Sequence, residues 1–327
     1  MKSKKVFLLL VLLFPLWLAA ADCSVCGRRI SGEYWKNDRG EYFCSKSCLA
    51  SALPKCTQCR RACEKVYSLM DKTFCSESCV KKHFRCASCL NGMDKIVTMH
   101  ASWGEKILVC EKCSKGPACY YCSVPGASVL LRDKRKICRK CRSTAVTDPG
   151  EVRKIFDQVR YNLSKWYGFD RMHVIHFTTV NEGQLKRLSG AIYRPDDSRQ
   201  MALMRYKAES RREVDRHGNV IREIPGKETC QIFVLYYVPK DMLIDAIVHE
   251  LTHDHIRHNV GKVSNLANEE GFCELVASLY NAKIGNGHLN RRKNTNPDKV
   301  YGEGFRKMRR YYLRNGRSLK RTIQYVK

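Results

Sequence analysis

The sequence predicts an α+β protein with two different kinds of structure along the chain. Nineteen cysteines are present, and sixteen of them form four regularly spaced quartets between residues 23 and 141. The composition then changes, and alternating apolar and helical patterns predict a compact domain over residues 147–327. One predicted helix of this domain carries His-Glu-x-x-His at residues 249–253, a motif typical of a metal site.

The first 21 residues have the layout of a secretory signal peptide. Lys2, Lys4 and Lys5 precede an apolar run at residues 6–18, and Ala19-Ala20-Ala21 supplies a small-residue cleavage site. The apolar run is shorter than the roughly 20 residues that a membrane-spanning helix needs, so an uncleaved anchor is the weaker alternative. We therefore expect an exported protein, periplasmic or secreted, with no transmembrane span after cleavage.

The cysteine quartets have the spacing of tetrahedral zinc sites. Each consists of two close pairs separated by 15 to 20 residues. The segments YFCSKSC and TFCSESC repeat almost letter for letter, which indicates an internal duplication. The four quartets are Cys23, Cys26, Cys44 and Cys48; Cys56, Cys59, Cys75 and Cys79; Cys86, Cys89, Cys110 and Cys113; and Cys119, Cys122, Cys138 and Cys141.

Disulfides are the alternative, because export normally means an oxidising compartment. Zinc is favoured because about 30 residues per quartet are too few for an apolar core, so metal binding would have to supply the folding energy. In each quartet a strand would deliver one cysteine and a helix start the next, as in a treble clef. Tandem quartets resemble a LIM domain, with one LIM-like double module expected at residues 22–82 and a second at 83–142. Three cysteines lie outside the quartets: Cys63, Cys230 and Cys273. Cys230 and Cys273 are predicted to be small buried apolar side chains.

The second half predicts a mixture of helices and strands. Asp148-Pro149 starts a helix that continues to about Tyr167. A strand follows within residues 172–180, then a hairpin that turns at residues 217–219, then a buried strand at residues 230–238 that Pro239 ends. Asp241 is the expected N-cap of the next helix. A small antiparallel sheet lying over a zinc-binding helix is the general architecture of zincin peptidases.

Helical geometry selects the metal ligands within DAIVHELTHDHIRH, residues 245–258. At about 100° per residue, His249 and His253 lie within roughly 40° of each other and can converge on one ion. Glu250 lies beside them and is suited to take a proton from the attacking water. His255 and His258 point to the far side and are expected to be exposed or helix-end histidines.

A catalytic zinc needs a third protein ligand and one open position. The predicted helix at residues 265–281 offers Glu269, Glu270 and Glu274. A glutamate about sixteen residues beyond the second histidine is the gluzincin arrangement, and Glu270, before Gly271, is favoured over Glu269. Glu274 could orient a ligand histidine. Tyr301 is a candidate catalytic residue for stabilising an oxyanion, with Tyr280 as the alternative.

Several of these segments carry a family resemblance. VLYYVP, VHELTHDHIR, EEGFCELVAS and the residues from VYGEGF onward resemble the peptidase domain of the LIM-containing organ-size-control peptidases of plants, the "DA-one" family. The resemblance implies a protein-cleaving zinc peptidase in which His249, Glu250, His253 and Glu270 carry the catalytic site. The ubiquitin-interacting segments of the plant proteins have no counterpart here, and a signal peptide stands in their place, as in an exported bacterial-type member.

The sequence thus predicts a zinc endopeptidase with about four structural zinc ions and one catalytic ion, whose modules recruit partners or inhibit the enzyme. The formal charge is +28, and residues 306–327 hold nine Lys and Arg and no acid. Such a tail could bind an acidic protein or an anionic surface, nucleic acid is not excluded, and a solvated basic helix is the plain alternative. The competing function is a basic zinc-ribbon adaptor that binds nucleic acid or protein and uses a non-catalytic peptidase fold as scaffold.

Overall fold

The computed structural model describes most of the chain in two compact units. Unit 1 comprises the described residues of 1–86, 90–97 and 108–111, and unit 2 those of 87–89, 98–107 and 112–327. Most of the expected signal peptide lies outside the described residues. None of the described helices combines the length and the hydropathy needed to cross a membrane. The description covers residues 3–5, 21–101, 104–170, 173–190, 200–261 and 263–327.

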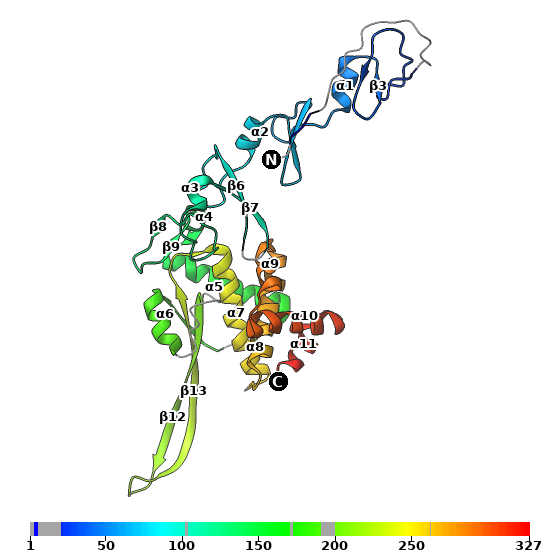
Figure 1. Ribbon diagram of the computed structural model, residues 1–327. Coiled ribbons are helices and arrows are strands. Elements are labelled where there is room, and N and C mark those ends of the chain that lie inside the picture. Colours follow the sequence, from blue (N-terminus) through cyan, green and yellow to red (C-terminus); the bar gives the residue numbers. More distant parts are fainter. Residues whose placement is uncertain (1–2, 6–20, 102–103, 171–172, 191–199, 262) are drawn as a thin grey trace. The chain divides into compact units, whose positions relative to one another are not determined.

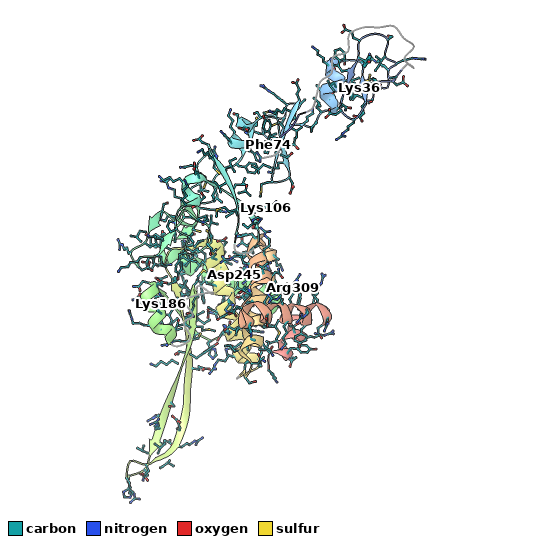
Figure 2. All side chains as sticks on the ribbon, in the orientation of Figure 1. Lys36, Phe74, Lys106, Lys186, Asp245 and Arg309 are labelled. Carbon is teal, nitrogen blue, oxygen red and sulfur yellow. The ribbon has the colours of Figure 1, made fainter. Side chains whose placement is uncertain are left out.

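The first two cysteine modules repeat one local structure because they repeat one sequence. In each, a two-stranded hairpin is followed by a helix of seven residues. Ser45 and Ser76 cap these helices in nearly the same extended backbone conformation, accepting a hydrogen bond from the cysteine three residues later. Phe43 and Phe74 are fully buried, and each fills a core of only a few side chains (Figure 2 labels Phe74). The elements are β2 (Trp35–Lys36), β3 (Tyr42–Phe43), α1 (Lys46–Ala52), β4 (Lys65–Leu69), β5 (Lys72–Phe74) and α2 (Glu77–His83), with β1 (Ser3–Lys5) paired to β4.

The third and fourth quartets lie on similar hairpins and short helices. These elements are β6 (Ile96–His100), β7 (Lys106–Cys110), α3 (Glu111–Ser114), β8 (Val129–Leu130), β9 (Lys136–Ile137) and α4 (Arg139–Ser143).

The main sheet of unit 2 has three strands in the order β11-β13-β12. β12 (Ala202–Val214) and β13 (Val220–Leu235) form the expected antiparallel hairpin, which extends well beyond the helices (Figure 1). β11 (Ile175–Val180) runs parallel to β13, so the sheet is mixed and departs from the antiparallel arrangement predicted from the sequence. The reason is that α6 (Glu182–Ser189) lies on the connection from β11 to β12, while β12 returns directly into β13 and leaves the other edge of β13 for β11.

The end of β13 also differs from the sequence prediction. The strand ends at Leu235, and Tyr237 has a positive φ of 61° in the following turn. Pro239 does not simply end that strand but belongs to β14 (Val238–Pro239), which pairs with β10 (Ala145–Val146). Proline is tolerated there because this pair has no further strand that needs its missing N–H.

The three helices predicted for the second half of the chain are present in unit 2, and one of their caps differs from the prediction. α5 (Pro149–Tyr167) begins after Asp148, whose carboxylate caps it, and α8 (Leu266–Lys283) begins after Asn265. α7 (Lys240–Asn259) begins after Pro239 without a side-chain cap. Asp241 is therefore not its N-cap: it lies in the first turn and hydrogen-bonds His288 at 2.8 Å.

The C-terminal elements pack on α8 through glycines. These elements are α9 (His288–Thr295), the π-helical turn η2 (Lys299–Glu303), α10 (Gly304–Arg314), α11 (Leu319–Thr322) and η3 (Ile323–Tyr325). A Cβ atom added to Gly271 would lie 2.3 Å from the backbone of Gly304, and one added to Gly302 would lie 2.0 Å from the carbonyl oxygen of Asn296. Only glycine permits these approaches, which hold α10 against α8 and η2 against the residue that follows α9.

The fourth cysteine module belongs to the core of unit 2. Cys119, Tyr121, Ile137 and Cys138 are buried in one hydrophobic cluster with residues of α5, α7 and α8. Arg135 is buried and donates a hydrogen bond of 2.9 Å to the backbone oxygen of Tyr236. The boundary expected near residue 147 therefore falls inside this unit.

Candidate functional site

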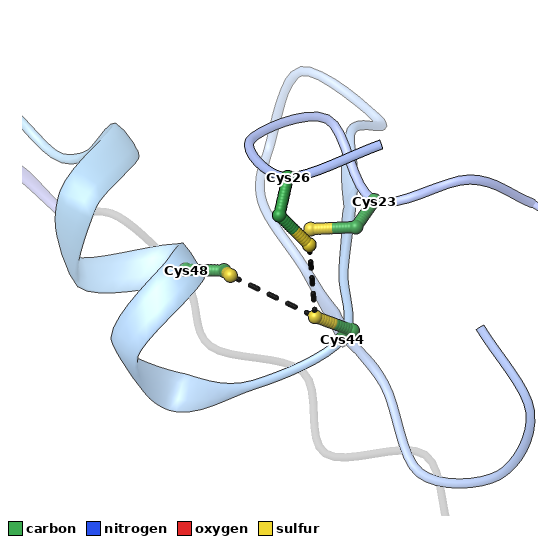
Figure 3. Close-up of side chains that lie close together, drawn as sticks. All are labelled: Cys23, Cys26, Cys44 and Cys48. Carbon is green, nitrogen blue, oxygen red and sulfur yellow. Dashed lines mark hydrogen bonds between the residues drawn. The ribbon is translucent and has the colours of Figure 1, made fainter. Parts of the chain in front are cut away.

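The four quartets each bring their sulfur atoms together. Within each quartet the four sulfurs lie within 4.8 Å of one another. In the first quartet, Cys26 and Cys48 lie 3.5 and 3.7 Å from the sulfur of Cys44 (Figure 3). A tetrahedron with zinc–sulfur bonds of about 2.3 Å has edges of about 3.8 Å, whereas a disulfide requires about 2.05 Å. The quartets thus have the dimensions of Cys₄ sites that could hold zinc.

A different set of potential ligands lies between α7 and α8. The Nε2 atom of His249 is 2.9 Å from Oε2 of Glu270, and the Nε2 atom of His253 is 3.5 Å from the same oxygen. The two imidazoles sit one helical turn apart on α7, as the helical spacing predicted, with ring centroids 5.0 Å apart. Two imidazole nitrogens and one carboxylate oxygen therefore converge on one point.

The second nitrogen of each imidazole is also held by a carboxylate. Nδ1 of His249 lies 3.2 Å from Glu274, and Nδ1 of His253 lies 2.8 Å from Glu269. These contacts fix the ring orientation and leave both Nε2 atoms for a metal, which is the usual arrangement around ligand histidines. Of the two glutamates considered as the third ligand, Glu270 thus contacts the two Nε2 atoms, whereas Glu269 contacts Nδ1 of His253.

The carboxylates around His249 and His253 give this site the negative charge that a bound cation would need. Burial alone would lower the pKa of His249, but hydrogen bonds to Glu270 and Glu274 raise it well above its usual value. Burial alone would raise the pKa of Glu270, but the two imidazoles hold it below its usual range, so this carboxylate is ionised. Such a group of buried carboxylates around two imidazoles fits a divalent cation.

Lys293 balances part of this negative charge. Its buried ammonium group contacts Asp245 at 3.0 Å and also pairs with Glu274. Asp245 comes from α7 (Figure 2) and Lys293 from α9. Glu274, the carboxylate that orients His249, is therefore held in turn by an ammonium group from a third helix. No pattern in the sequence indicated this pairing, because a lysine in a basic helix is normally expected to lie in solvent.

Glu250 follows His249 on α7 and lines a cavity beside the potential ligands, although its side chain is almost entirely buried. Burial raises its pKa, and the nearby His249 and His253 act in the opposite direction. The nearby backbone of Met204, on β12, also acts to lower this pKa. The cavity has a volume of about 660 Å³ and is lined by β12, α7, α8, α9 and η2.

Tyr301 and Tyr280, the two candidates for stabilising an oxyanion, lie in different surroundings. Tyr301, on η2, lines the cavity with its ring centroid 6.3 Å from that of His249. Burial raises the pKa of Tyr301, so its hydroxyl stays protonated and can donate a hydrogen bond. Tyr280 accepts a hydrogen bond from Asn162 and packs on Trp166, and it is not among the residues that line the cavity.

His255 and His258 do not join the cluster of ligands, but one of them is not exposed as expected. His255 is half-buried and stacks on Phe169 with a centroid distance of 3.6 Å. Burial lowers the pKa of His255 to about 4. His258 is exposed and stacks on His173 at 4.0 Å.

Cys273 lies in the cluster of potential ligands, although the sequence predicts a different role for it. Cys273 was expected to be a buried apolar side chain, yet its sulfur lies within 4.8 Å of ligand nitrogens of both His249 and His253. Its position, one helical turn after Glu270, was the available signal.

Comparison with known proteins gives relatives in plants. "Protein DA1-related 2" of Arabidopsis thaliana is 24% identical over 198 residues, 55% of this chain and 38% of its own length. "LIM domain-containing protein HDR3" of Oryza sativa subsp. japonica is 21% identical over 284 residues, 79% of this chain and 56% of its own length. The chain is similar to DA1-related and LIM domain proteins. Together with the cysteine clusters, this similarity supports a LIM- and DA1-like family.

The similarity is distant and partial. "Protein DA1-related 6" of Arabidopsis thaliana is 24% identical over 256 residues, 68% of this chain and 38% of its own length. This chain spans roughly two fifths to just over half of the length of these relatives. No protein-family model matches the chain.

Proposed function

We propose that the protein is a zinc-dependent endopeptidase of the zincin type. The observation that carries the proposal is the convergence of the Nε2 atoms of His249 and His253 on one carboxylate oxygen of Glu270. Two imidazoles and a carboxylate are a ligand set that zinc prefers in catalytic sites. The buried carboxylate of Glu250 adjoins this set, and the cavity is large enough to admit part of a peptide.

The residues around the site suit hydrolysis of a peptide bond. A bound zinc ion would polarise the substrate carbonyl and lower the pKa of a water molecule. The carboxylate of Glu250 would accept a proton from this water as its oxygen forms a bond to the carbonyl carbon. The same carboxylate would pass the proton to the amine nitrogen as the carbon–nitrogen bond breaks. A raised pKa of Glu250 favours this second transfer.

The surrounding elements suit an extended peptide. β12 is one of the two edge strands of its sheet, and Ala202, Leu203 and Met204 of this strand line the cavity. An edge strand can pair with the backbone of a substrate. The hydroxyl of Tyr301 would donate a hydrogen bond to the oxygen on which negative charge develops. A protein substrate is therefore favoured over a small molecule.

The remaining parts complete the proposal. The cysteine modules would recruit the substrate or inhibit the enzyme, and the signal-like N-terminus would direct export. The basic C-terminal residues could attract an acidic protein or an anionic surface. Arg309 and Arg310, on α10, are exposed for such a contact (Figure 2 labels Arg309).

Separate substitutions distinguish metal binding from catalysis. Glu250→Gln keeps the size of the side chain but cannot accept a proton, so zinc content should remain while proteolysis falls by about 10²-fold or more. Glu270→Gln should lose or weaken the zinc of the α7–α8 site. Glu269→Gln is the matched control and should do much less, because its oxygen can still accept from Nδ1 of His253. Full proteolysis by Glu250→Gln would refute the mechanism.

The adaptor hypothesis makes a different prediction for the metal content. An adaptor would need four zinc ions, whereas the peptidase needs five. Tyr311 of the tail stacks on Tyr325 at 4.3 Å, and Phe305 and Met308 are buried, so these side chains serve packing rather than stacking on nucleic-acid bases. About five zinc ions per purified chain would favour the peptidase, and about four would favour the adaptor.

A further inference from the structure

Cys273 occupies a position that the proposed reaction does not use. It is fully buried on α8, three residues after Glu270, and therefore lies on the same helical face. Its sulfur lies within 4.8 Å of a ligand nitrogen of His249 and of a ligand nitrogen of His253. Cys273 thus offers a sulfur ligand to the same two imidazoles that face the carboxylate of Glu270.

We propose that Cys273 is a fourth protein ligand of the metal bound by His249, His253 and Glu270, so that the resting site is closed. This inference rests on the proposed metal site and adds a regulatory property to it. Zinc with four protein ligands is typical of structural sites, whereas a catalytic site keeps one position open. A thiolate is a strong ligand for zinc and is released from it only when another ligand takes its place.

The consequence is a latent enzyme. Binding of the metal by Cys273 requires that the thiol gives up its proton, which passes to solvent. Catalysis then requires that the thiolate leaves the metal, takes up a proton and makes room for water. Removing the thiol should therefore open the site permanently and raise proteolysis, while it weakens the hold on the metal.

Cobalt absorption tests the ligand assignment without relying on activity. The full-length protein would be prepared with zinc in the Cys₄ sites and cobalt in the α7–α8 site, and spectra would be compared at equal zinc and cobalt content. The wild-type protein should show a thiolate-to-cobalt charge-transfer band beyond that of the zinc-loaded protein. Cys273→Ala and Cys273→Ser should lose this band and bind cobalt about tenfold or more weakly. Cys230→Ala, which removes a buried thiol from β13, should keep both properties.

The outcomes separate this inference from the proposed function. Identical spectra for wild type and Cys273→Ser would overturn the assignment of Cys273, even if the protein cleaves peptides. A band that depends on Cys273, together with no proteolysis by either the wild type or Cys273→Ser, would support the ligand and refute the peptidase. If Cys273→Ala fails to fold, Cys273→Ser keeps the size of the side chain and supplies the same comparison. Increased proteolysis by Cys273→Ser, relative to Cys230→Ala, would support latency, and unchanged proteolysis would refute it.

Discussion

The buried ammonium group of Lys293 links two carboxylates to the metal ligands. Asp245 and Glu274 both contact it, and Glu274 also holds Nδ1 of His249. Without this ammonium group, two carboxylates would lie close together with little water. Lys293→Ala should therefore lower the free energy of unfolding by about 3–5 kcal/mol. Denaturant unfolding measures this loss, and a change of less than about 1 kcal/mol would show that the pair relaxes into solvent.

The matched control for this prediction is an exposed ion pair of the same helix. Arg291 pairs with Glu105 at 3.0 Å, and the two side chains are 54% and 40% exposed. Exposed pairs contribute about 0–1 kcal/mol because water and salt screen the charges. Arg291→Ala should therefore change stability by less than a third of the effect of Lys293→Ala.

His255 makes a contribution to stability rather than to metal binding. Its ring stacks on Phe169 and is half-buried on the side of α7 away from the ligands. His255→Ala should lower the thermal midpoint by several degrees, since it removes a packed aromatic contact worth about 1 kcal/mol. His258→Ala, at an exposed position of the same helix, should change it less. Both variants should keep the metal of the α7–α8 site, and metal loss in His255→Ala would contradict the geometry of α7.

At the scale of elements, the approach of α8 to α10 positions Tyr301. Gly271 and Gly304 bring the two backbones into contact, and η2 carries Tyr301 into the cavity immediately before α10. Gly271→Ala would place a methyl group 2.3 Å from the backbone of Gly304, so the helices must separate. We expect a loss of about 2 kcal/mol or more of stability and a fall in activity. Gly287→Ala, where a Cβ meets nothing within 4 Å, is the control and should be nearly neutral.

The elements that the sequence could predict are those with local signals. The capping residue Asp148, the apolar spacing of α8 and the turn after Asp215 all act within a few residues, and the structure follows them. The parallel pairing of β11 with β13 joins segments about fifty residues apart and leaves no periodic signal in either strand. The same reason explains why Lys293 was missed: its partners come from two other helices. Cys273 was assigned to the core because a buried thiol and a ligand thiol have the same pattern on a helix.

At the scale of the whole molecule, the fourth cysteine module stabilises the domain that holds the α7–α8 site. β10 pairs with β14 immediately before α7, and Arg135 bonds the backbone of Tyr236. Arg292, on α9, also donates to the backbone oxygen of Tyr121. The zinc of the fourth quartet would thus hold elements that contact β14, the turn before it and α9.

A truncation series tests this dependence. The fragment of residues 147–327 keeps every ligand of the α7–α8 site but loses β10, Tyr121 and Arg135, whereas the fragment of residues 112–327 keeps them all. Removal of this module would leave buried apolar surface of β14 and α7 in water, at a cost of about 25 cal/mol for each Å². We therefore expect the shorter fragment to aggregate or to unfold at a lower temperature, and the longer one to bind two zinc ions and to unfold cooperatively. Equal thermal midpoints for the two fragments would show that the domain is complete from residue 147, and that the fourth module only packs against it.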